Sequence, residues 1–116
     1  MAKHNELGKK GEQIALNFLQ QKEIKILEKN WRFLRAEIDI IFLENNTLVF
    51  TEVKTRSTSA YGNPEEFVSD KKLSLYLDAA EEYLKQKKLS HEIRFDIISI
   101  VFYSDNPIIK YIKDAF

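Results

Sequence analysis

Three charged residues interrupt two short apolar segments near the middle of the chain. Asp39 lies within "EIDIIF", and Glu52 and Lys54 lie two residues apart in "TEVKTR". A hairpin that only filled a hydrophobic core would not carry these charges. Carboxylates supply the hard oxygen ligands that Mg²⁺ or Mn²⁺ prefers. A lysine can hold a water molecule or stabilise negative charge that develops on a phosphate. The residue types therefore predict metal-assisted chemistry on a phosphate.

The spacing of these residues predicts that they share one face of a hairpin. If Asn45-Asn46 forms a two-residue turn, Asp39 lies opposite Glu52, with the two Cβ atoms ~4.5–5.5 Å apart. Like charges at that separation repel, and a divalent cation between them would offset the repulsion. Lys54 points to the same face because side chains alternate along a strand.

A third carboxylate could join this group from the first predicted helix, over residues 5–22. Glu12 falls within the apolar arc of that helix. An unpaired buried charge is very unfavourable, so we expect Glu12 to reach the metal site or Lys54. A plainer interpretation stays open: Glu12 forms a salt bridge on the helix face, and Asp39, Glu52 and Lys54 form a salt-bridged patch on a solvated sheet. Spacing alone does not separate the two interpretations.

Hydrophobic periodicity predicts seven elements in the order α-β-β-β-α-β-β. Ser69 is the expected N-cap of the second helix. Gly62 and Pro64 punctuate a polar loop over residues 57–67. We read one domain, 1–116, with a mixed sheet flanked by two main helices. The predicted helices cover 5–22 and 70–88, and the predicted strands cover 24–33, 38–43, 48–53, 93–103 and part of 106–116.

Composition restricts the class of protein. No segment approaches the ~18 consecutive apolar residues of a membrane span. The absence of cysteine excludes disulfides and thiolate metal sites, and makes a reducing cytoplasm the expected compartment. Basic and acidic residues balance at 18 each, which argues mildly against a general nucleic-acid binder. The first 35 residues nevertheless hold eight Lys or Arg against four Glu. That surplus is compatible with phosphate contacts.

Five segments carry a resemblance that covers nearly the whole chain: "GKKGEQIALNFL", "AEIDIIF", "FTEVKTR", "YGNPEEFV" and "IRFDIISI". Together they resemble the YraN-like family of bacterial proteins, grouped with the PD-(D/E)XK nuclease superfamily. The resemblance implies an α/β, restriction endonuclease-like fold. It matches Asp39, Glu52 and Lys54 to the superfamily motif and Glu12 to a helix glutamate near the metal. It also implies that the Val53 carbonyl is a further metal ligand.

The implied function is a Mg²⁺- or Mn²⁺-dependent endonuclease that hydrolyses phosphodiester bonds in DNA, including branched or recombination intermediates. Asp39, Glu52, Lys54 and Glu12 would then be the catalytic group. Lys54 would hold the attacking water while the cation neutralises charge on the phosphate. Nearby basic residues would contact DNA, and a homodimer is compatible with cutting two strands. The alternative is a non-catalytic module on the same fold that binds nucleic acid or a protein partner. The expected DNA contacts are Arg56, Lys71 and Lys72.

Overall fold

The computed structural model describes residues 2–57, 69–102 and 106–116, with side chains described from residue 6 onward. The predicted loop over 57–67 lies outside these ranges apart from its first residue, and so does Tyr103 of the predicted fourth strand. The predicted order of elements is confirmed. The elements are α1 (Ala2–Gln20), β1 (Lys25–Phe33), β2 (Ala36–Glu44), β3 (Thr47–Arg56), α2 (Asp70–Lys87), β4 (Glu92–Phe102) and β5 (Pro107–Ile112).

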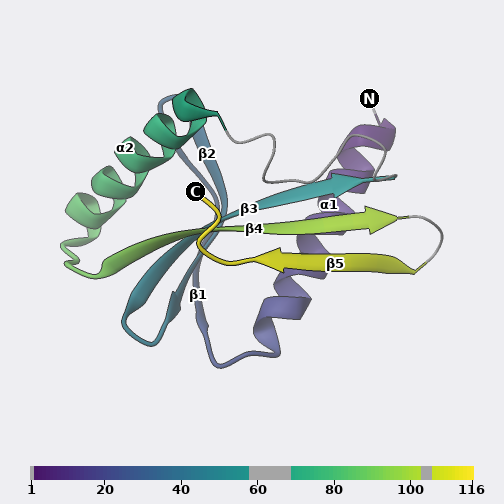
Figure 1. The fold of residues 1–116 in the computed structure, drawn as a ribbon, viewed down its shortest axis with the longest axis horizontal. Coiled ribbons are helices and arrows are strands. Elements are labelled where there is room, and N and C mark those ends of the chain that lie inside the picture. Colours follow the sequence, from purple (N-terminus) through teal and green to yellow (C-terminus); the bar gives the residue numbers. More distant parts are fainter. Residues whose placement is uncertain (1, 58–68, 103–105) are drawn as a thin grey trace.

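The strands form one five-stranded sheet in the order β1-β2-β3-β4-β5. Strands β3 and β4 are parallel, and the other neighbouring pairs are antiparallel. A parallel pair needs a crossover connection, and the segment that contains α2 supplies it. The sheet twists so strongly that β1 and β2 run across the direction of β4 and β5 (Figure 1). The fold is therefore α/β with a mixed sheet, consistent with the restriction endonuclease-like architecture that we expected.

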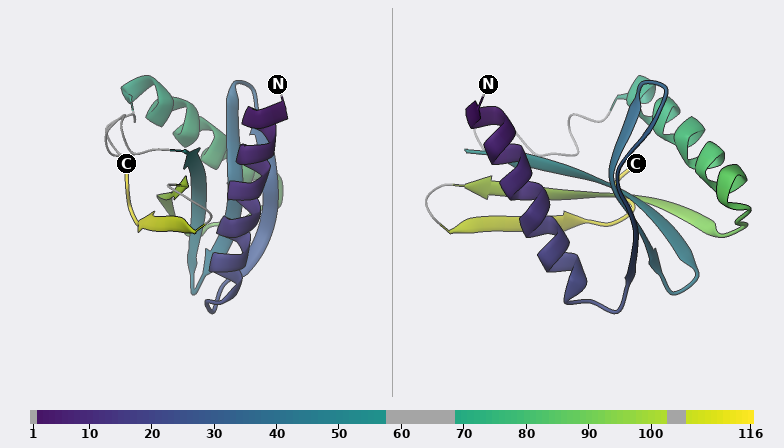
Figure 2. Two further views of the ribbon diagram at one scale, coloured as in Figure 1. Left: turned by 90° about the vertical axis from the view of Figure 1, so that its right-hand side faces the viewer. Right: turned by 180° about the vertical axis from the view of Figure 1, so that it is seen from behind.

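The two helices cover opposite faces of the sheet (Figure 2). On one face, Ala15 and Leu19 of α1 pack in a buried cluster with Phe42, Val49 and Ile98. On the other face, the buried side of α2 meets a second cluster that is rich in aromatic rings. Its fully or nearly fully buried members include Ile38, Ile41, Leu48, Phe50, Tyr76, Ala79, Ala80, Tyr83 and Phe95. The predicted N-cap of α2 is confirmed, since the Lys72 N–H donates to Ser69 Oγ at 3.1 Å.

Helix α1 lies unusually close to β3 at Gly11. A Cβ atom at this position would lie 1.9 Å from Thr55 Oγ1 and 2.9 Å from Thr55 Cβ. Only glycine therefore permits this approach of helix backbone to strand. The next residue along α1 is Glu12, so the close crossing sets where its carboxylate meets the sheet.

The hairpin of β2 and β3 has the register that the sequence predicts. Asn45 adopts the positive φ of the turn, 55°. The pairing runs from Glu44–Thr47 back to Ile40–Thr51 and ends there. Beyond that point β3 pairs only with β4, as far as the Arg56–Val101 pair. Strands β2 and β3 thus separate after Ile40–Thr51, and we call this opening the β2–β3 fork. No helix in the described ranges is both long and apolar enough to cross a membrane.

Candidate metal and phosphate site at the β2–β3 fork

Asp39 lies at the point where the fork opens. Its Oδ2 accepts a hydrogen bond from the backbone N–H of Val53 at 2.7 Å. This side-chain bond replaces the backbone ladder, which ends at Ile40–Thr51, one residue from Asp39 in β2 and two residues from Val53 in β3. Asp39 and Glu52 therefore lie at the same end of the hairpin, but the prediction that they lie directly opposite each other on one face is not confirmed. They do not form a regular cross-strand pair, because the Asp39 carboxylate occupies the Val53 amide.

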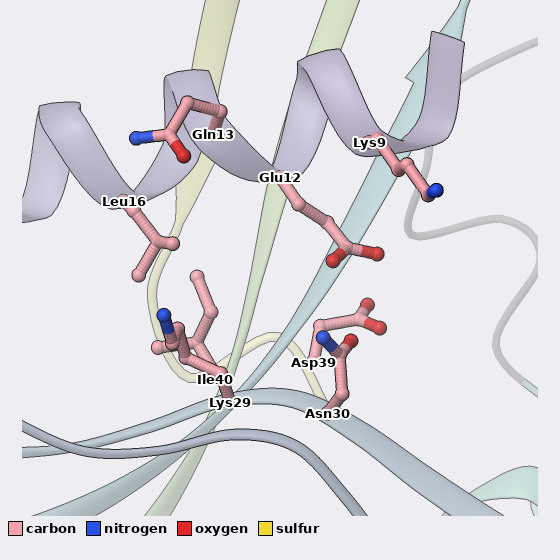
Figure 3. A pocket seen from close by; sticks show the side chains of 8 residues that line it. All are labelled: Lys9, Glu12, Gln13, Leu16, Lys29, Asn30, Asp39 and Ile40. Atoms are coloured by element: carbon pink, nitrogen blue, oxygen red, sulfur yellow. The ribbon is translucent and has the colours of Figure 1, made fainter. Parts of the chain in front are cut away.

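Glu12 approaches Asp39 from the α1 side. Figure 3 shows the Glu12 carboxylate pointing from the helix toward that of Asp39, with the Asn30 side chain next to Asp39. Asn30 has a positive φ of 52° within β1, at the point that lies beside Asp39. The cavity between helix and sheet has a volume of about 240 Å³. Its lining residues are Lys9, Glu12, Gln13, Leu16, Lys29, Asn30, Asp39 and Ile40.

The environment of Asp39 opposes its ionisation. The pKa of Asp39 is raised from 3.8 to about 7, mainly by burial and to a smaller extent by repulsion from Glu12, Glu52 and Glu37. The hydrogen bond from Val53 acts in the opposite direction because it favours the charged form. The ionised carboxylate is thus stabilised too weakly by the protein alone, and a bound cation would supply the missing positive charge.

Glu52 lies on the α2 side of the fork and is buried, with 8% of its surface exposed. Its Oε1 forms an ion pair with Lys72 and lies 3.7 Å from the Lys54 Nζ. Its Oε2 is buried and has no hydrogen-bond partner within the described ranges. Burial, the charge of Glu52 and a side-chain hydrogen bond with Glu52 raise the pKa of Tyr76. The Glu52 carboxylate therefore lies between Lys54, Lys72 and Tyr76.

Lys54 is partly buried beside Glu52. Burial lowers the pKa of Lys54, and attraction to Glu52 partly opposes that change. Repulsion from Lys72 and Arg56 lowers the pKa of Lys54 further. The fork thus has carboxylates toward α1 and a basic group toward α2, with Glu52 between them.

The structure brings the predicted carboxylates and Lys54 to one region of the sheet. Around the fork lie Glu12, Asp39, Glu52 and Lys54. Val53 contacts Asp39 through its N–H, and its carbonyl as a metal ligand stays a prediction. Within the described ranges, no three His, Asp or Glu side chains are arranged so that they could hold a metal ion as they stand.

The basic residues that we expected to contact DNA differ in their surroundings. Lys72, which we expected to contact DNA, forms an ion pair with Glu52. Lys71 is exposed at the start of α2, and Arg56 is half-buried near Lys54. Sequence reasoning missed the Lys72–Glu52 contact because it depends on how the crossover places α2. Asn30 was missed as well, although an asparagine within a strand is a signal for positive φ.

Comparison with known proteins places the chain in a family. The model of an uncharacterised protein family, UPF0102, matches residues 11–100. The chain belongs to this family. A UPF0102 protein of Christiangramia forsetii is 48% identical over 116 residues, which cover all of this chain and 98% of that protein. UPF0102 proteins of Flavobacterium psychrophilum (47%, all of this chain, 98% of that protein) and Geobacter metallireducens (43%, all of this chain, 97% of that protein) are also similar.

The UPF0102 match confirms the YraN-like resemblance inferred from the five sequence segments. The matched region begins one residue before Glu12 and contains the whole fork. It includes every predicted site residue, from Glu12 through Lys72. It ends at Ile100 within β4, so β5 lies beyond it. The part of the chain that defines UPF0102 is therefore the part that builds the candidate site.

Proposed function

We propose that this UPF0102 protein is a metal-dependent endonuclease that hydrolyses phosphodiester bonds in DNA. One observation carries the proposal: Glu12, Asp39 and Glu52 approach the same fork beside Lys54. The motif spacing and the α/β fold support the same class of enzyme. Branched DNA and recombination intermediates are the substrates that we propose to test first.

The donor set fits a hard divalent cation. Mg²⁺ keeps several waters and needs only one or two protein carboxylates together with substrate phosphate. Asp39, Glu52 and Glu12, with the Val53 carbonyl, would hold Mg²⁺ or Mn²⁺. The unpaired Oε2 of Glu52 and the unfavourable ionisation of Asp39 both support this fit. When bound, the cation would neutralise negative charge on the phosphate under attack.

The basic groups of the chain have separate roles in this proposal. Water attacks phosphorus, the bond to one ester oxygen breaks, and that oxygen takes up a proton. Lys54 is partly buried 3.7 Å from Glu52, so its ammonium can hold the water or stabilise charge in the transition state. Arg56 and Lys71 lie where they can contact phosphates. Lys72 orients Glu52 through their ion pair.

A second candidate function is a non-catalytic module that binds nucleic acid or a protein partner. The Lys72–Glu52 ion pair favours it, because a lysine already neutralises the carboxylate that a metal would need. In such a module the lysine would replace the cation. DNA affinity would then be independent of Asp39 and of divalent metal.

The deciding experiment combines calorimetric titration of Mg²⁺ and Mn²⁺ with cleavage assays on linear, flapped and four-way DNA. For the nuclease, we expect Lys54→Ala to lower the cleavage rate by about 10²–10³ while metal and DNA binding persist. Lys85→Ala, at an exposed position on α2, is the matched control and should cleave normally. Wild-type protein that binds DNA and cuts none of these forms with either metal would establish the binding module instead.

A further inference from the structure

The turn between β1 and β2 presents an exposed leucine in an unusual backbone conformation. Leu34 is 82% exposed, more than any other large apolar side chain in the described ranges. Its φ is 55°, in the left-handed region that disfavours residues with a branched or bulky side chain. Leu34 and Arg35 are the two turn residues between the paired Phe33 and Ala36. Neither burial nor backbone preference explains a leucine here.

The second hairpin of the chain provides an internal comparison. The β2–β3 turn also has two residues, and its first residue, Asn45, has the same φ of 55°. Asparagine tolerates this conformation well, because its short polar side chain can hydrogen-bond locally. The positive φ is thus adopted by a residue that tolerates it, Asn45, in one turn and by a residue that does not favour it, Leu34, in the other. Strain of this kind concentrates at functional positions.

The strands below Leu34 hold the turn firmly. The rings of Trp31 and Phe33 stack with centroids 6.4 Å apart. Trp31 also packs edge-on against Tyr83 of α2, at 5.2 Å. Ala36, on the other side of the turn, is 3% exposed within the same cluster. The residues on either side of the turn are therefore well packed, which holds Leu34 in a fixed position suitable for insertion into a partner.

Positive charge flanks the leucine on both sides. The Arg32 side chain is 76% exposed and forms an ion pair with Glu37 at 2.6 Å. Arg35 is exposed at the second turn position. An exposed ion pair contributes little stability, so the Arg32 guanidinium can exchange Glu37 for a phosphate. The Leu34 side chain thus lies between two guanidinium groups. A nucleic acid matches this arrangement, because its stacked bases present apolar faces and its backbone carries negatively charged phosphates.

The turn is placed to act together with the fork. It lies beside the first turn of α2, and α1 begins farther along the same upper side of the molecule (Figures 1 and 2). Strand β2 joins it directly to the site, because Asp39 is five residues beyond Leu34. Five extended residues span at most roughly 17 Å. That distance corresponds to about five nucleotide steps of a duplex strand.

We propose that Leu34 is a wedge that inserts between bases of DNA, while Arg32 and Arg35 contact the phosphates on either side. This inference rests on the proposed function and names a substrate class for it: duplex DNA with interrupted stacking, such as a nick, gap or junction. Apolar wedges separate base steps at an energetic cost, and that cost is least where stacking is already broken. The wedge would place cleavage within about five nucleotides of the interruption.

The test uses duplexes with 2-aminopurine at a nick or in a continuous strand, with EDTA present so that no cleavage occurs. Wild-type protein should raise the fluorescence at the nick, because 2-aminopurine brightens when it is unstacked. Leu34→Asn should abolish the rise and lower the preference for nicked over continuous DNA about tenfold. Its thermal midpoint should equal or exceed that of wild type, because asparagine suits the turn. Ile108→Asn, at another exposed apolar position (55%), should behave as wild type.

The outcomes separate this inference from the proposed function. A Leu34-dependent rise in fluorescence without cleavage in Mg²⁺ or Mn²⁺ would support the wedge and refute the nuclease. Cleavage with the same fluorescence for wild type and Leu34→Asn would refute the wedge and support the nuclease. Absence of DNA binding would overturn both. Loss of self-association in sedimentation, with unchanged DNA binding, would show that Leu34 contacts a second copy of the chain and would overturn the wedge.

Discussion

Replacing Asp39 by asparagine should stabilise the metal-free protein, and by more at high pH than at low pH. Asparagine is nearly the same size, and its oxygen can still accept the hydrogen bond from the Val53 N–H. The replacement removes only the charge. Folding raises the pKa of this carboxyl from 3.8 to about 7. The folded state therefore binds the proton more tightly than the unfolded chain does, and ionisation favours unfolding.

The size of the effect follows from that shift. The destabilisation is absent below pH 3.8, grows as the pH rises, and is complete above about 7. One pKa unit corresponds to about 1.4 kcal/mol, so the full effect is at most about 4 kcal/mol. Between about pH 5 and about pH 8, the advantage of Asp39→Asn should grow by about 2 to 3 kcal/mol. In a domain of this size that corresponds to roughly 10 °C in thermal midpoint.

The assay is thermal and urea unfolding of wild type and Asp39→Asn at both pH values, in EDTA and then in Mg²⁺. Asp78→Asn, at an exposed aspartate on α2, is the control and should show no such pH-dependent advantage. Added Mg²⁺ should stabilise wild type and leave Asp39→Asn unchanged, since a ligand that binds only the folded state raises stability. An Asp39→Asn advantage that is the same at both pH values would refute the reasoning about burial and repulsion.

Two further substitutions test the elements that position the fork. Gly11→Ala should lower the unfolding free energy by about 1–3 kcal/mol, because its Cβ would strike Thr55, where only 1.9 Å is available. Gly8→Ala is its control, with no atom within 4 Å of the added Cβ, and should stabilise α1 by about 0.5–1 kcal/mol. Asp96→Ala should lower the urea midpoint by the equivalent of about 3–5 kcal/mol, because it removes the buried carboxylate that accepts from Arg94, Tyr111 and the Asp114 N–H. A loss below about 1 kcal/mol would show that Glu44, 3.0 Å from the Arg94 guanidinium, compensates for the lost carboxylate.

Local chemistry in the sequence was sufficient for much of the architecture. The periodicity of apolar residues located both helices, and Ser69 marked the start of α2. The Asn45-Asn46 turn determined the β2–β3 register, because a two-residue turn allows only one pairing of the strands that follow it. The order of motifs was sufficient for the family. The helices, the cap and the turn each depend on residues that lie within a few positions of one another.

Only the tertiary structure decided the electrostatics of the site. The ladder stops at Ile40–Thr51 because the Asp39 carboxylate takes the Val53 amide, and no turn rule predicts that choice. Lys72 reaches Glu52 only because the crossover brings α2 over that face of the sheet. Burial is the largest cause of the raised pKa of Asp39, and it depends on every element packed around this residue. The sequence could name the charged residues, but their energies depend on distance and solvent exclusion between segments that are remote in the chain.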